Sequence, residues 1–336
     1  MNRTGGGMRN QYGALFAQTE IFPLFEKMSA KALDFSPNLG SSISAGMDFI
    51  AVNETSLSVD EDLSTNSGAT TYERDSQNSF LVESGSLYLQ AQVIPGQLSF
   101  YLDETVAPGG ASNREAFVLI ESLPHQGYLK AGRMLLPYGL RVWDDETFVR
   151  QRTGFNFDNQ DLGVEVGIEP GPWSLSLAVS NGTQGARDDN QGKMLSSVGA
   201  LWLGKTVLGG SFALNQSRGT ERLLAGPFAS LRLGPLTWMG EVDLIQQSSG
   251  IDNDEFVAFT SVEYWFNSAV NFRASFDYVD PYDAIEEDEA SRLTLGCDVF
   301  LTPFLSATAY YRMRESIPQD IRGNSDGISV GLHGFF

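Results

Sequence analysis

Apolar and polar residues alternate with a period of two along much of the chain. From Val270 to Tyr278 every second residue is apolar, and the residues between them are polar. The same alternation recurs in Leu293–Leu301, Leu305–Met313 and Ile328–Phe336. A period of two is typical of β-strands whose two faces meet different environments. The end of the chain therefore predicts four consecutive strands of one kind.

The connections between the expected strands alternate between short and long. The short ones are Pro95-Gly96, Pro124–Gln126, Pro170-Gly171, Gly204-Lys205, Gly234-Pro235, Asn267-Ser268 and Thr302-Pro303. The others are longer or more polar: Glu54–Ser79, Thr105–Asn113, Leu135–Gln160, Thr183–Lys193, Ser217–Thr220, Ser248–Asp254, Pro281–Glu289 and Glu315–Asp326. Membrane-spanning barrels have short periplasmic turns and long extracellular loops. The sorting of the connections therefore predicts an all-β fold, a transmembrane antiparallel β-barrel.

The strand count agrees with a closed barrel. Counting from Ser42 to Phe336 gives 16 strands, an even number that leaves both chain ends on the short-turn side. Glu20–Phe35 does not alternate cleanly, and counting it as strand would give 18. We interpret residues 1–38 as a periplasmic N-terminal extension and 39–336 as the barrel. Because Met1–Gln11 has no apolar signal core, localisation has to be inferred from the rest of the chain.

Aromatic residues support a lipid-facing outer surface. Most of them fall near the expected strand ends, where aromatic girdles lie at membrane interfaces. They are Tyr88, Trp173, Trp202, Phe212, Trp238, Tyr264, Trp265, Phe266, Phe304, Tyr310, Tyr311, Phe335 and Phe336. Aromatic residues are common in any β-sheet, but here they accompany apolar alternation in many strands. This pattern favours a membrane girdle.

Composition excludes several classes of function. The net charge of −20, from 22 Lys and Arg against 42 Asp and Glu, predicts no nucleic-acid partner. The chain contains no run of about 20 consecutive apolar residues, which is the length that a membrane-spanning helix needs. The single cysteine, Cys297, excludes an internal disulfide or a haem-attachment motif within the chain. His125 and His333 lie in no local hydrolase motif, so we expect no enzyme, cofactor or metal.

Two segments resemble bacterial outer-membrane porins. The final strand, Gly327–Phe336, alternates and ends in Phe336, and it resembles the insertion signal that outer-membrane barrels present to the barrel-assembly machinery. The stretch Lys130–Arg141 is similar to the Gly-Arg/Lys-x-x-x-Pro-aromatic-Gly-Leu segment of phosphate-selective porins of the O and P type. In that family the following loop, here 135–160, enters the lumen and narrows the pore. Phosphate-selective members carry lysine-rich lumens, whereas this chain has five lysines.

Charged residues in that loop and on inward strand positions are the candidates for setting pore selectivity. They are Arg133, Arg141, Arg150, Arg152, Asp144, Asp145, Arg273, Arg292, Arg312, Arg314, Glu241, Asp243 and Glu263. Arginines that face carboxylates across the pore would create a transverse field. Alternatively, the charges simply neutralise one another across neighbouring strands. The sequence leaves both interpretations open.

The expected function is an outer-membrane porin, a water-filled channel for passive diffusion of small hydrophilic solutes, with anions as one candidate class. The alternative is a barrel that forms a sheath around a partner such as a multihaem cytochrome, in an electron conduit. Expected partners are outer-membrane lipid, lipopolysaccharide and small solutes, with a homotrimer as one assembly. The acidic runs Asp60–Asp62, Asp252–Glu255 and Glu286–Glu289 are interpreted as solvated loops, since none has EF-hand spacing.

Overall fold

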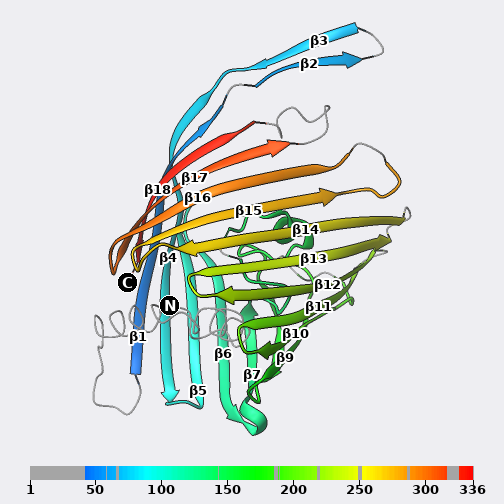
Figure 1. The fold of residues 1–336 in the computed structure, drawn as a ribbon. Coiled ribbons are helices and arrows are strands. Elements are labelled where there is room, and N and C mark those ends of the chain that lie inside the picture. Colours follow the sequence, from blue (N-terminus) through cyan, green and yellow to red (C-terminus); the bar gives the residue numbers. More distant parts are fainter. Residues whose placement is uncertain are drawn as a thin grey trace.

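The barrel is closed by hydrogen bonds between neighbouring antiparallel strands. The computed structural model describes residues 42–57, 59–65, 68–142, 144–184, 188, 190–217, 220–248, 252–285, 288–315 and 325–335. Sixteen strands of this part form the closed barrel (Figure 1). This confirms the predicted 16-strand all-β barrel. Among the same residues, no helix is long and apolar enough to cross a membrane.

The barrel strands follow one another in chain order, and each pairs with the next. They are β1 (Ser42–Ser56), β4 (Gln77–Ile94), β5 (Leu98–Ala107), β6 (Ser112–Leu123), β7 (Gly127–Met134), β8 (Asp161–Ile168), β9 (Trp173–Ser180), β10 (Met194–Leu203), β11 (Thr206–Ser217), β12 (Thr220–Leu233), β13 (Leu236–Ser248), β14 (Asp252–Trp265), β15 (Val270–Asp280), β16 (Ala290–Thr302), β17 (Leu305–Glu315) and β18 (Gly327–Phe335). All fifteen connections between these strands fall where the turn pattern predicts them.

The two ends of the barrel differ in their connections. One end carries the tight turns, including η1 (Pro124–Gln126), and β1 begins and β18 ends there. The other end carries the longer loops. In one of them, β2 (Val59–Thr65) and β3 (Gly68–Arg74) form a separate two-stranded ribbon beyond the barrel (Figure 1). Glu20–Phe35, the segment considered for two further barrel strands, lies outside the described residues, as does the whole expected extension 1–38.

Each barrel strand has one face toward the lumen and one toward the outside. In β9 the inward residues Ser174, Ser176 and Ser180 are buried, while Leu175 and Val179 point outward and are exposed. An antiparallel barrel in lipid requires this arrangement, because every backbone amide is paired within the sheet and the outer side chains are apolar. The architecture is that of an outer-membrane barrel.

The first and last strands close the barrel in a defined register. Asp48 of β1 pairs with Phe335, and Ser56 pairs with Gly327. The His333 Nε2 lies 2.5 Å from the Asp48 Oδ2 across this seam. A slip of one residue would move inward side chains to the lipid face. The side-chain contact and the hydrophobic pattern therefore specify the same closure.

Candidate functional site: the lumenal loop

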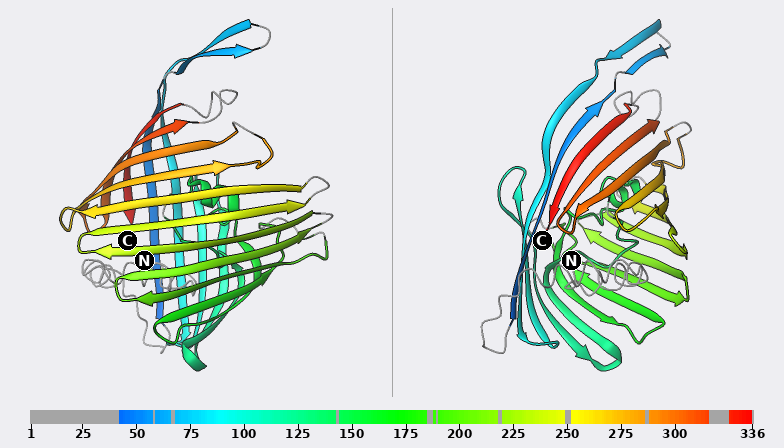
Figure 2. Two further views of the ribbon diagram at one scale, coloured as in Figure 1. Left: turned by 45° about the vertical axis from the view of Figure 1, so that its right-hand side comes forward. Right: turned by 60° about the vertical axis from the view of Figure 1, so that its left-hand side comes forward.

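The long connection 135–160 between β7 and β8 folds into the barrel (Figure 2). Its residues Leu136, Tyr138, Leu140 and Val149 are buried and belong to one hydrophobic cluster with inward residues of the wall. A short helix, α3 (Phe148–Thr153), contacts β13, β14 and β15. The loop therefore occupies part of the lumen along this side of the barrel.

The first half of the loop is held by hydrogen bonds to two inward wall strands. The Gly139 amide donates to the Ser211 Oγ at 2.7 Å, and the Leu140 amide donates to the Glu241 Oε2 at 2.8 Å. The Tyr138 hydroxyl donates to the Asp243 Oδ1 at 2.7 Å. Backbone amides bonded to a wall hydroxyl and a wall carboxylate fix the path of the main chain itself.

Gly139 is required at this point for two reasons. Its φ of +56° lies in the left-handed region that residues with a Cβ rarely adopt. A Cβ at this position would also lie 1.9 Å from the Glu241 Oε1. The close approach of the loop to the wall depends on the missing side chain.

The helix α3 is fixed at both ends. Its first residue, Phe148, donates its amide to the Asp277 Oδ1 at 3.0 Å. Within the helix, the Arg150 Nη2 lies 3.0 Å from the Glu241 Oε2, and the Arg150 side chain is only 1% exposed. At the other end, the Arg222 Nη1 donates to the Thr153 carbonyl at 2.9 Å, and Arg152 pairs with Glu255 of β14. Glu241 therefore binds both the helix and the preceding backbone.

A second cluster joins Asp144 and Glu146 to three arginines of β16 and β17. The Asp144 Oδ2 lies 3.4 Å from Arg292 and 3.5 Å from Arg312. The Glu146 Oε2 lies 3.5 Å from both of these arginines and 3.6 Å from Arg314. The Glu146 side chain is 56% exposed and Arg314 is 32% exposed, whereas Arg292 is buried. Glu146 and Arg314 therefore border the open part of the lumen.

Asp145, between Asp144 and Glu146 in sequence, bonds to the loop itself rather than to the wall. Both of its carboxylate oxygens accept the Phe157 amide at 2.9 Å. Burial raises the pKa of Asp145 to about 6, and the Phe157 hydrogen bond opposes part of that rise. The carboxylate joins the beginning of the loop to its end.

The remaining candidates lie in different surroundings. Arg141 donates to the Leu136 carbonyl inside the loop. Arg133 pairs in register with Ala116 and Leu162, and Leu162 is on the exposed outer face. Glu263, Arg273 and Asp298 form a separate chain of ion pairs at 3.3 and 3.0 Å. The structure thus brings the wall residues Glu241, Asp243 and Arg292 against the loop residues Asp144 and Arg150 or their neighbours, and it separates Arg133 from the loop.

Sequence reasoning missed several residues that hold the loop. Ser211, Tyr138 and Arg222 were not among the candidates, although each contacts or belongs to the docked segment. The strand alternation carries the signal for two of them, since it places Ser211 and Arg222 on inward positions of β11 and β12. Which part of the loop they would meet depends on the loop path, which the alternation does not specify.

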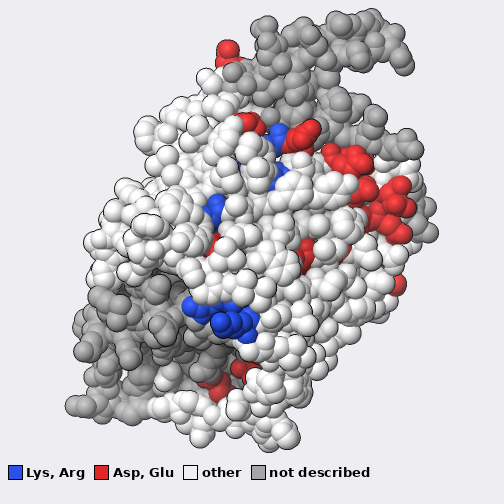
Figure 3. Space-filling view, in the orientation of Figure 1, with Lys and Arg blue, Asp and Glu red and all other residues white. Residues whose placement is uncertain are grey.

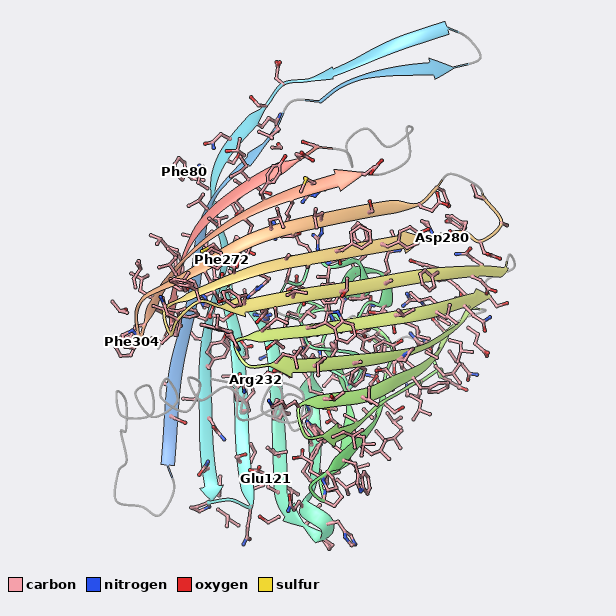
Figure 4. The ribbon with its side chains drawn as sticks, in the orientation of Figure 1. Phe80, Glu121, Arg232, Phe272, Asp280 and Phe304 are labelled. Atoms are coloured by element: carbon pink, nitrogen blue, oxygen red, sulfur yellow. The ribbon has the colours of Figure 1, made fainter. Side chains whose placement is uncertain are left out.

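No cluster of three or more metal-ligating side chains occurs among the residues with described placement. Acidic side chains gather instead at the long-loop end of the barrel (Figure 3). They include Asp280, which Figure 4 labels at the end of β15, with Asp288 and Glu289 after it in the chain.

Comparison with solved structures identifies the fold as that of outer-membrane porins. An anion-selective porin from Comamonas acidovorans matches with a TM-score of 0.67 at 14% identity, over 88% of this chain and all of that chain. OmpF of Salmonella typhi matches with a TM-score of 0.66 at 11% identity, over 90% and 99% of the two chains. The outer-membrane channel DcaP of Acinetobacter baumannii matches with a TM-score of 0.63 at 9% identity, over 90% and 99%.

No family model and no curated protein sequence matches the chain. The structural identities are 9 to 14%, so these matches establish the fold alone. The resemblance to the phosphate-selective O and P type stays a prediction.

Proposed function

We propose that this protein is an outer-membrane channel through which small hydrophilic solutes diffuse passively. The observation that carries the proposal is a closed 16-strand barrel that holds its own loop inside the lumen. A barrel of this strand number encloses an aqueous channel unless something fills it. The likeness to proteins described as a porin and a channel favours a channel over an enzyme.

The alternative, a sheath around a cytochrome, has less support. A sheath needs a lumen that is free for its partner, whereas the loop 135–160 takes up part of this lumen. None of the three structural matches described above is a sheath for a cytochrome.

Ion preference is proposed to depend on Arg312, Arg314 and Glu146. Glu146 and Arg314 border the open part of the lumen, Arg312 is paired with Glu146 just behind them, and Arg152 is a further exposed candidate. Arg150 and Arg141 hold the loop instead, because both are buried and bonded. Anion preference is supported by the arginines and by the description of one structural match as anion-selective. The carboxylates paired with these arginines oppose it.

Single-channel recording in a planar bilayer tests the proposal. We expect stable ohmic steps from the purified, heat-modifiable barrel, and swelling of protein-loaded liposomes in small sugars but not in large ones. The reversal potential in a KCl gradient then reports the preferred ion. A correctly folded barrel that gives neither conductance steps nor swelling would contradict the proposed function.

Assembly and insertion give two further proposals. A homotrimer is supported by a structural match that is described as a trimer form, OmpT of Vibrio cholerae.

Phe336, the proposed signal for the barrel-assembly machinery, lies outside the described residues. Its deletion is expected to deplete the protein from outer-membrane fractions, because an unclosed strand edge is costly in lipid. Unchanged heat-modifiable barrel in those fractions would contradict this role. Contacts with lipopolysaccharide stay a prediction.

A further inference from the structure

Two basic residues occupy lumen-side positions at the short-turn mouth of the barrel. Lys205 directly precedes β11, and Arg232 is the next-to-last residue of β12, which Figure 4 labels at this end. The Arg232 amide donates to the Lys205 carbonyl at 2.9 Å, so the two backbones adjoin. Strand alternation places Arg232 on the face of the buried Phe228 and Ser230, and Lys205 on the face of the buried Val207. This basic pair therefore belongs to the lumen and not to the lipid surface.

Neither member of the basic pair has a carboxylate partner among the residues that the structure describes. The Arg232 Nε donates to the Gly234 carbonyl at 3.2 Å, which holds the guanidinium beside the turn between β12 and β13. Lys205 is exposed and Arg232 is half-buried. By contrast, Lys130 and Lys193 each have a carboxylate partner, at 2.9 and 2.7 Å. The basic pair thus carries charge that the described side chains do not neutralise by contact.

The carboxylates that follow along the same register are engaged by another arginine. Arg232 pairs in register with the uncharged Thr237, and Thr237 pairs with Glu263. Arg273 lies 3.3 Å from Glu263 and 3.0 Å from Asp298, so this group keeps a single negative charge. Two strand spacings of about 4.8 Å separate Arg232 from Glu263, which exceeds the screening length of about 8 Å at physiological salt. The mouth is therefore positive on the side of the basic pair.

We propose that Lys205 and Arg232 bind the anionic group, a carboxylate or a phosphate, of a solute that passes the short-turn mouth. Arginine presents a planar fork that matches two oxygens of such a group, and lysine adds a mobile point charge. The site is separate from Glu146 and Arg314, which border the lumen beside the docked loop. It deepens the proposed function and rests on it, because the solute has to cross the barrel.

Protection of Lys205 from acetylation tests the site on the folded barrel in detergent and requires no conductance. A limiting amount of an uncharged acetylating reagent is used, and peptide mass spectrometry follows Lys205 and, as the control, the exposed Lys193. Relative to sodium chloride of equal ionic strength, inorganic phosphate at about 50 mM should slow the acetylation of Lys205 about threefold. Lys193 should be unaffected, and R232Q should abolish the protection.

Acetate in place of phosphate distinguishes the two sources of anionic group, because the anion that protects at the lower concentration identifies the class of solute. Lack of protection by both anions would overturn the proposal. Full protection in R232Q would overturn it too, provided that heat-modifiable mobility verifies a folded barrel.

The reversal potential in a KCl gradient tests whether the site acts on transport. K205Q/R232Q should shift this potential toward cation preference, whereas K205R/R232K keeps both charges and should match the wild type. The shift should be larger near 0.1 M salt than near 1 M, because the screening length falls from about 10 Å to about 3 Å. An unchanged potential in folded K205Q/R232Q at the lower salt would overturn the role in solute passage. Absence of any conductance would instead contradict the proposed function, and the acetylation experiment would still decide whether the site binds anions.

Discussion

The two parts of the lumenal loop are held in different ways. Around Gly139 and Leu140, backbone amides bond to Ser211 and Glu241, and the residues are buried. At Asp144 and Glu146, side-chain carboxylates meet wall arginines at 3.4 to 3.6 Å, and Glu146 is largely exposed. Backbone bonds fix where the loop runs, whereas exposed ion pairs contribute little to its stability. We therefore propose that the first part sets the shape of the channel and that the second sets its charge.

Replacing Glu241 with alanine is expected to have the largest effect. It leaves the Leu140 amide and the buried Arg150 guanidinium unpaired, and removing one partner of a buried pair costs about 3–5 kcal/mol. The loop should detach, so that trypsin cleaves after Arg150 and Arg152 and channel currents become noisy. The matched control is Glu263→Ala, which breaks a buried pair with Arg273 away from the loop. If the loop resisted trypsin equally well in both variants, the role of Glu241 as an anchor of the loop would be contradicted.

Gly139→Ala tests the close approach of the loop to the wall. The new Cβ would overlap the Glu241 carboxylate, and overpacking of this kind costs about 1–3 kcal/mol. Gly96→Ala is the control, because its φ of +70° imposes similar backbone strain but nothing lies within 4 Å of the added Cβ. Trypsin should cleave the loop of the first variant faster than that of the second. Identical cleavage rates in the two variants would show that the loop does not pack tightly against the wall at Gly139.

Asp145 is expected to make loop docking depend on pH. Its pKa is raised to about 6 in the folded protein, so the docked state binds a proton more tightly than the free chain does. Docking is therefore most stable near pH 4 and weakens as the pH rises to 6, by an amount on the order of 1–2 kcal/mol. Proteolysis of the loop measured across this range should show the trend, and Asp145→Asn should flatten it. Parallel profiles for the two proteins would count against the burial of this carboxylate.

Glu146→Gln is expected to change selectivity and leave stability almost unchanged. An exposed ion pair contributes about 0–1 kcal/mol, but removal of the carboxylate leaves Arg312 and Arg314 with more positive potential toward the lumen. The reversal potential in a KCl gradient should move toward anion preference, with conductance changed only modestly. The control, Asp188→Asn, alters an exposed pair in the connection between β9 and β10, away from Glu146 in the chain. The same reversal potential in all three proteins would place the selective region elsewhere.

The barrel could be predicted from the sequence because its signals are local. Alternation assigns each side chain a face, and turn residues such as Gly204 and Pro303 mark the strand ends. The position of the lumenal loop came from its length and from the resemblance of Lys130–Arg141 to porins. These features lie within a few residues of one another, so no knowledge of the closed barrel is needed to recognise them.

The contacts of the loop could not be predicted in the same way. Arg150 and Glu241 are 91 positions apart, and only the path of the folded loop brings them together. For the same reason, arginines that look equivalent in the sequence differ in the structure, with Arg150 buried and Arg314 bordering open space. The residue types predicted that charged side chains line the lumen. They did not predict which of these charges are neutralised by an ion-pair partner.

The central claim is that the docked loop narrows a water-filled lumen. The most direct test is the single-channel conductance of a variant in which residues 144–156 are replaced by a short Gly–Ser linker. The wall strands are unchanged in this variant, and heat-modifiable mobility verifies that its barrel is closed. We predict a conductance clearly larger than that of the wild type and admission of larger sugars in liposome swelling. Equal conductance and equal sugar cut-off in the two folded barrels would contradict the account.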